Sequence, residues 1–195
     1  MKYKICVSGA AKTDCCSDSA LELSREIGKE IVKQDGVVIT GATTGIPYWA
    51  ARGAKEGNGI SIGFSPAASE KEHLKVYRLP VDYFDVIVYT GFNYSGRNLL
   101  LTRASDGIIF VCGRMGTLNE FTIAFEDQKP IGILEGTGGV ADDLRKIINE
   151  AKRRGRLHPK IVFNKNPKRL VEELILLIKK GKGRKNLNFY GRRRF

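Results

Sequence analysis

The sequence predicts a single doubly wound, mostly parallel α/β sheet with helices on both faces, a Rossmann-like fold. Short apolar runs that suit buried strands alternate with segments of helical spacing along almost the whole chain. Several of these runs end in glycine turns, which suit the tight passage from a strand to a helix. The composition, 42% hydrophobic and 28% charged over 195 residues, is typical of a globular protein that can bury a sizeable core.

Seven apolar runs are expected to form strands. They are Lys4–Ser8, Val37–Thr40, Ile60–Gly63, Val86–Tyr89, Gly107–Cys112, Pro130–Leu134 and Lys160–Phe163. Helices are expected from Ala20 to Asp35, Gly45 to Gly57, Gly96 to Thr102, Thr117 to Asp127, Val140 to Arg153 and Pro167 to Ile178. The stretch from Phe64 to Asp85 is expected to be a long crossover with one short strand near Val76.

The chain divides into a Rossmann-like nucleotide-binding domain over residues 1–180 and a basic C-terminal tail over residues 181–195. The net charge is +12, and six basic residues but no acidic ones lie in the tail. The tail has too few apolar residues to build a core by itself. Three roles stay open for it: a solvated tail, docking of its aromatic residues on a subunit, or nucleic-acid binding. Nucleic acid is not the expected partner.

The sequence also indicates the cellular compartment in which the protein is expected. No apolar run reaches the roughly 18 residues that a membrane helix needs, so no membrane partner is expected. The first residues enter a strand directly without a signal peptide, which predicts a cytoplasmic protein. In that reducing compartment Cys15 and Cys16 are expected to be unpaired thiols, and Cys6 and Cys112 to be buried apolar residues. No metal site is expected, because the cysteines and histidines lack a ligand spacing.

The candidate site centres on a glycine turn that follows a buried strand and opens a helix, between Cys112 and Phe121. Such a turn presents backbone N–H groups and the positive end of a helix dipole, where phosphate binds readily. We therefore expect nucleotide or phosphate contacts from Gly113, Arg114, Met115, Gly116 and Thr117.

Other glycine turns are expected at the same edge of the sheet, where ligands of doubly wound folds bind. They supply the further candidates Gly9, Gly41, Thr43, Thr44 and Gly45. Arg97 and Arg103 precede the central turn and are expected to add charged contacts to a phosphate. For Arg103 an ion pair with Asp106 is an equal alternative.

Glu120 has two interpretations. It completes the pattern T-x-x-E with Thr117, which is typical of a helix-capping box. Alternatively, its carboxylate faces the ligand held by the turn, where it could stabilise positive charge on a sugar or orient an attacking water.

The motifs resemble those of a known family. The order G-R-N-x-x-x-x-R-x-S-D, apolar strand, G-x-x-G-T-x-x-E, which contains Arg97 and Glu120, looks like the Lonely Guy family and the related molybdenum-cofactor carrier proteins. The turn Thr40–Ile46 and the helix after it resemble the same group, which includes the nucleotide fold of DNA-processing protein A. One position departs: Arg114 stands where members usually carry glycine, so it either clamps phosphate or obstructs the pocket.

The resemblance implies an activity and an assembly. In Lonely Guy enzymes the matching arginine and glutamate cleave the N-glycosidic bond of a nucleoside monophosphate, so Arg97 and Glu120 are the catalytic candidates. The alternative is a non-catalytic carrier or sensor that holds a nucleotide or the molybdenum cofactor as a ligand. No other cofactor is expected, because the sequence has neither a nicotinamide fingerprint nor a Walker lysine. Relatives are homodimers with the pocket near the interface, which predicts at least a dimer here.

Overall fold

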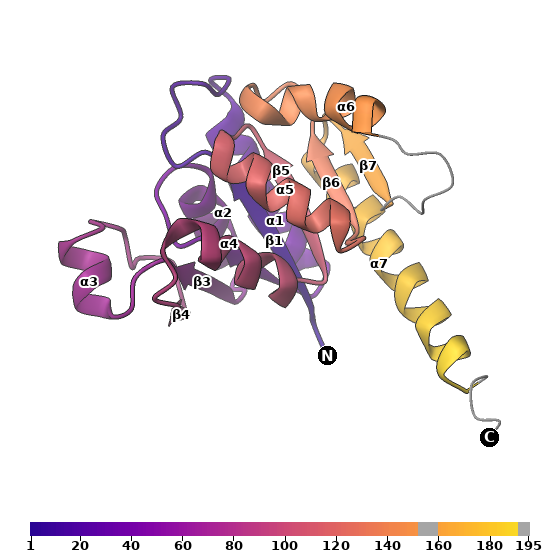
Figure 1. Ribbon diagram of the computed structural model, residues 1–195, viewed down its shortest axis with the longest axis horizontal. Coiled ribbons are helices and arrows are strands. Elements are labelled where there is room, and N and C mark those ends of the chain that lie inside the picture. The colour runs from indigo at the N-terminus through magenta and orange to yellow at the C-terminus, as the bar shows by residue number, and fades with distance from the viewer. Residues whose placement is uncertain (152–159, 191–195) are drawn as a thin grey trace.

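The computed structural model describes residues 1–151 and 160–190, which form one seven-stranded sheet (Figure 1). All neighbouring strands pair in parallel, in the order β4-β3-β2-β1-β5-β6-β7. The strands are β1 (Tyr3–Gly9), β2 (Gly36–Thr40), β3 (Ser61–Ser65), β4 (Val86–Tyr89), β5 (Gly107–Val111), β6 (Ile131–Leu134) and β7 (Ile161–Asn164). The predicted doubly wound fold is confirmed, and the strand order reverses between β1 and β5.

Helices cover both faces of the sheet. They are α1 (Ala20–Lys33), α2 (Ile46–Glu56), α3 (Glu70–Lys75), α4 (Asn93–Ala104), α5 (Met115–Glu126), α6 (Gly139–Ala151) and α7 (Pro167–Tyr190). In Figure 1, α4, α5 and α6 lie on the near side, α1, α2 and the first turns of α7 lie behind, and α3 stands off beside β4. Each helical layer packs against one face of the sheet, so the described part of the protein has two separate hydrophobic cores.

The central strands supply both cores because their side chains alternate between faces. In β5, Ile109 and Val111 pack with α1, α2 and α7, whereas Ile108 and Phe110 pack with α4, α5 and α6. All of β5 is buried. This explains why the sequence shows an unbroken apolar run rather than a period of two.

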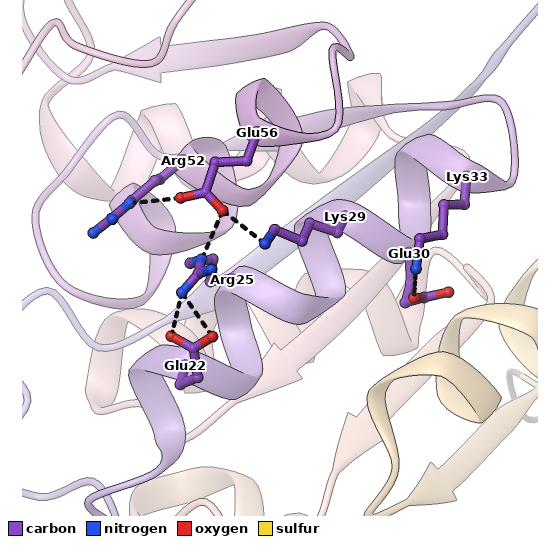
Figure 2. Close-up of polar contacts among 7 residues, drawn as sticks. All are labelled: Glu22, Arg25, Lys29, Glu30, Lys33, Arg52 and Glu56. Carbon is purple, nitrogen blue, oxygen red and sulfur yellow. Dashed lines mark hydrogen bonds and ion pairs between the residues drawn. The ribbon is translucent and has the colours of Figure 1, made fainter.

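An ion-pair network joins α1 to α2 on the surface (Figure 2). Glu56 accepts hydrogen bonds from Lys29 and Arg25 of α1, each at 2.8 Å, and from Arg52 of its own helix at 2.9 Å. These bonds, that from Lys29 first, lower the pKa of Glu56 from 4.5 to about 2. The ionised carboxylate of Glu56 therefore stabilises the folded protein.

The crossover between β3 and β4 differs from the prediction. It contains the helix α3 and no strand near Val76, which is 70% exposed. Ser69 caps this helix, because its side chain accepts a hydrogen bond from the backbone N–H of Glu72 at 3.2 Å. The pattern S-x-x-E over residues 69–72 was the signal for this helix.

The C-terminal part also extends beyond the prediction. Helix α7 runs to Tyr190 rather than ending near Ile178, so part of the predicted tail continues the helix. The remaining tail residues, 191–195, and the predicted helix end at Arg153 lie outside the described residues. Within the part of the chain that is described, no helix is long and apolar enough to span a membrane.

The cysteine prediction was wrong for two residues. Cys16 and Cys112 form a disulfide, while Cys6 and Cys15 are free. Cys16 lies in the turn after β1 and Cys112 in the turn after β5, and these strands are neighbours in the sheet. The pairing therefore depends on strand order, which a separation of 96 residues hides in the sequence.

Candidate functional site

A cavity of about 540 Å³ lies at the carboxyl ends of β1 and β5, where the strand order reverses. Its walls come from the turns after β1, β2 and β5 and from the first turns of α4 and α5. This is the place where doubly wound sheets bind ligands, and its size suits a small molecule.

The turn after β5 forms one wall. Gly113 has φ 105°, and a Cβ there would lie 2.5 Å from the Thr117 side chain, so only glycine allows this close turn. Helix α5 then begins at Met115, which leaves the first backbone N–H groups without partners inside the helix. A Cβ built on Gly116 meets no atom within 4 Å, so space is open in front of this backbone. The geometry suits an anion.

A buried charge cluster lies beside this turn. Arg97 and Glu120 are only 5% and 6% exposed, and the Arg97 Nη1 to Glu120 Oε1 distance is 3.4 Å. The Ser8 hydroxyl donates a hydrogen bond to Glu120 Oε2. With its amide nitrogen turned toward the carboxylate, Asn98 donates to Oε1 at 2.8 Å. Both carboxylate oxygens of Glu120 are thus engaged.

Burial and ion pairing shift the pKa of Glu120 in opposite directions. Burial raises the pKa of its carboxyl group, and the Arg97 charge and the Ser8 hydrogen bond oppose that rise only in part. The net direction is upward. The site therefore holds a carboxyl group that takes up a proton more readily than a surface glutamate does.

Arg97 is not fully satisfied by the protein. Its Nε atom is buried and has no hydrogen-bond partner among the described residues. Its guanidinium packs on Gly41, where a Cβ would lie 1.9 Å from Nη1. Gly41 therefore makes room for this arginine, and the buried guanidinium lines the cavity together with Tyr94, whose ring lies 5.9 Å from it.

The remaining predicted residues separate into two groups. Gly9, Thr43, Arg114 and Met115 line the cavity. Thr44 and Gly45 do not belong to its lining, and the Thr44 hydroxyl instead donates to the carbonyl of Ala11 at 3.0 Å. Thr44 therefore joins the turns after β1 and β2.

Both interpretations of Arg103 were wrong. Its side chain is 60% exposed and pairs with Asp127 at 2.9 Å, while Asp106 pairs with Lys4. Arg103 lies in the last turn of α4, at the opposite edge of the sheet from the cavity. It cannot contact a ligand bound beside Arg97, which lies in an earlier turn of the same helix.

The capping-box interpretation was also wrong. The N-cap of α5 is Arg114, so Thr117 lies inside the helix rather than at its cap. Thr117 is 4% exposed and packs against Gly113. Glu120 reaches across to Ser8 of β1 instead of back to its own helix start.

Arg114 lies at the mouth of the cavity. It forms an ion pair with Asp14, and its side chain is 47% exposed. It neither fills the space in front of Gly116 nor lies in the buried cluster.

A protein-family model matches residues 2–171. The chain belongs to the SLOG cluster4 family. The match spans most of the chain and includes every residue of the buried cluster.

Solved structures share the fold of this SLOG protein. The protein TM1055 superposes with a TM-score of 0.74 at 25% identity, covering 92% of this chain and 99% of that one. The molybdenum cofactor binding protein of Rippkaea orientalis gives 0.72 at 24% identity, covering 91% and 98%. The molybdenum cofactor carrier protein of Chlamydomonas reinhardtii gives 0.72 at 23%, covering 92% and 99%. At these identities the last two show a common fold.

Among the residues that sequence reasoning missed in this SLOG protein are Ser8, Asn98 and Tyr94, which lie beside Arg97 and Glu120 in the cavity lining. Ser8 is the penultimate residue of β1, next to the switch point, and this position could have marked it. Asn98 and Tyr94 flank Arg97 on α4, but nothing in their spacing pointed to Glu120.

Proposed function

We propose that the cavity binds a small molecule in which a phosphate group is attached to a heterocycle, either a nucleoside monophosphate or a pterin such as the molybdenum cofactor. The phosphate binds to the backbone N–H groups at the start of α5, and Arg97 supplies positive charge beside it. The position of Arg97 in the cavity lining and the open backbone at Gly116 both suit an anionic ligand.

The first candidate is a carrier or sensor that binds this ligand without changing it. One observation carries this choice: both oxygens of Glu120 are engaged, Oε2 by the Ser8 hydroxyl and Oε1 by the Arg97 guanidinium. A carboxylate so engaged serves to position Arg97 rather than to activate a water molecule. The Rippkaea protein binds the molybdenum cofactor and the Chlamydomonas protein carries it, and both roles agree with this choice.

The second candidate is a phosphoribohydrolase of the Lonely Guy type. The raised pKa of Glu120 and its position in the cavity lining favour it. In that reaction the carboxylate would stabilise the oxocarbenium-like ribose and orient water, while Arg97 would hold the carboxylate in place. The products would be a free base and ribose 5-phosphate.

Incubation of the pure protein with AMP, followed by liquid chromatography, separates the two candidates. The carrier assignment predicts that AMP is recovered intact from the protein and from Glu120→Gln alike. Release of adenine by the wild-type protein, lost in Glu120→Gln, would instead establish the hydrolase. Binding of AMP, measured in parallel, is expected in both cases.

A further inference from the structure

Three cysteine sulfurs gather where the turns after β1 and β5 meet. Cys16 and Cys112 form the disulfide, and the Sγ of the free Cys15 lies 3.7 Å from the Sγ of Cys112. All three sulfurs lie within 4.8 Å of one another. A free thiol therefore stands beside a disulfide, a few tenths of an ångström beyond the separation of about 3–3.5 Å at which reacting atoms attack.

The backbone around these sulfurs is held in place by the turn before α6 and by the first turn of that helix. The Cys112 N–H donates to the Thr137 hydroxyl at 2.8 Å, and its carbonyl accepts from the N–H of Ala141 at 2.9 Å. On the other side, Cys16 forms a β-bridge with Gly138. Because both loops are anchored to the same turn, the sulfurs are positioned for reaction without a large movement.

Cys15 has the surroundings of a reactive thiol and Cys6 does not. Cys15 is partly exposed, so a small disulfide can reach its sulfur. Cys6 is buried, and burial raises the pKa of its thiol, which keeps it protonated and inert.

We propose that Cys15, Cys16 and Cys112 form a thiol–disulfide exchange site whose reactants are small thiols and small disulfides. In this site Cys15 is the nucleophile that attacks the small disulfide. The buried Cys112 then forms a disulfide with Cys15, and Cys16 is the partner of Cys112 in the resting state. The assignment does not depend on the ligand of the cavity.

The steps balance in atoms and electrons. In the reduced protein the Cys15 thiolate attacks a small disulfide, R–S–S–R, which forms a Cys15 mixed disulfide and releases one RS⁻. The Cys112 thiolate then attacks Cys15 Sγ, which releases the second RS⁻ and forms a Cys15–Cys112 bond. Finally the Cys16 thiolate attacks Cys112 Sγ, and Cys15 leaves as a thiolate and takes up a proton. Two protein thiols are oxidised and one R–S–S–R is reduced to two RSH.

The test follows the sulfurs in the full-length chain. The protein is reduced, the reductant is removed, and glutathione disulfide is added as the probe. Samples are quenched in acid, alkylated, digested and mapped by mass spectrometry. The wild type is expected to end as Cys16–Cys112. Cys16→Ser is expected to stop at Cys15–Cys112, and Cys15→Ser to form its disulfide at least tenfold more slowly.

Cys6→Ser is the control, because Cys6 lies outside the cluster, and it is expected to match the wild type. Circular dichroism establishes that each variant is folded before the reaction starts. Two results would overturn the proposal. One is a folded Cys16→Ser protein in which Cys15 and Cys112 remain separate thiols. The other is Cys15→Ser forming Cys16–Cys112 at the wild-type rate, which would make Cys15 a bystander.

Discussion

Glu120 and Arg97 depend on each other at the base of the cavity. Each is more than nine-tenths buried, so each would be an uncompensated charge without the other. Ser8 of β1 donates a further hydrogen bond, so the Glu120 carboxylate of α5 is held between β1 and Arg97 of α4. The residue that the sequence marked as a catalytic candidate is therefore also a structural partner of Arg97.

This dependence predicts a large stability loss for Glu120→Ala. The variant leaves the Arg97 guanidinium buried without its counter-charge, which should lower the free energy of unfolding by about 3–5 kcal/mol. Loss of a helix cap alone would lower it by only about 1 kcal/mol. Urea denaturation measures the difference, and Glu126→Ala, an exposed acid on the same helix, is the control. A loss as small as that of the control would show that the pair does not hold the site together.

At the scale of elements, α1 and α2 are joined by close packing and by charge. A Cβ on Gly53 would lie 1.9 Å from the carbonyl oxygen of Arg25, so glycine lets the two helices approach. Glu56 then lies within hydrogen-bond distance of Arg25 and Lys29 across the contact. Because the pKa of Glu56 is lower in the folded state, its contribution to stability is present above about pH 4.5 and is lost as the pH falls toward about 2.

Glu56→Gln tests this network through its pH dependence. The wild type should melt at a higher temperature than the variant at pH 7, and the gap should close as the pH falls from about 4.5 toward about 2. Thermal denaturation followed by circular dichroism gives both values. Asp143→Asn, which removes an exposed carboxylate from α6, should show no such gap. A gap for Glu56→Gln that is independent of pH would exclude an ionic origin.

The sequence predicted the elements because their signals are local. Apolar runs such as Ile108–Val111, and the glycine turns that follow strands, depend only on neighbouring residues, so the parallel sheet and its ligand-binding edge could be inferred. Thr117 was misassigned as a cap because the helix begins two residues earlier, at Met115. The helix at Glu70–Lys75 was missed although its cap was visible.

The partners within the site could not be predicted in the same way. Ser8 and Glu120 are separated by 112 residues, and Cys16 and Cys112 by 96. Each pair meets only because β5 lies next to β1 in the sheet. Arg103 was predicted to contact the same ligand as Arg97 because the two residues are close in the sequence. They lie in different turns of α4, and Arg103 is at the edge of the sheet opposite the cavity.

At the scale of the whole molecule, six exposed apolar side chains of the described residues lie on the edge strand β4, at the N-cap of α4 and on α4 itself. They are Val86, Val88, Phe92, Tyr94, Leu99 and Leu100. Tyr94 also lines the cavity, so this surface borders the candidate site. Apolar residues concentrated in this way are typical of subunit interfaces. The predicted homodimer remains a proposal, and this is the surface that we assign to it.

Leu99→Arg is expected to give a monomer, because a charge would be buried in the proposed interface. Light scattering combined with size-exclusion chromatography measures the mass. Leu176→Arg provides the matched control, since Leu176 is 53% exposed on α7, away from α4 and β4. A wild-type protein that is monomeric at high concentration would exclude the dimer, and dissociation by the control variant alone would place the interface elsewhere.

The central claim is that the start of α5 and Arg97 bind the phosphate of a small ligand. Calorimetric titration with AMP and with adenosine tests it most directly, on the wild type, Arg97→Lys and the control Arg103→Lys. We predict that the wild type and the control bind AMP at least tenfold more tightly than adenosine. In Arg97→Lys the AMP affinity should fall by about 1.5–3 kcal/mol, while that for adenosine changes little. Equal affinity of the wild type for AMP and adenosine would contradict the account.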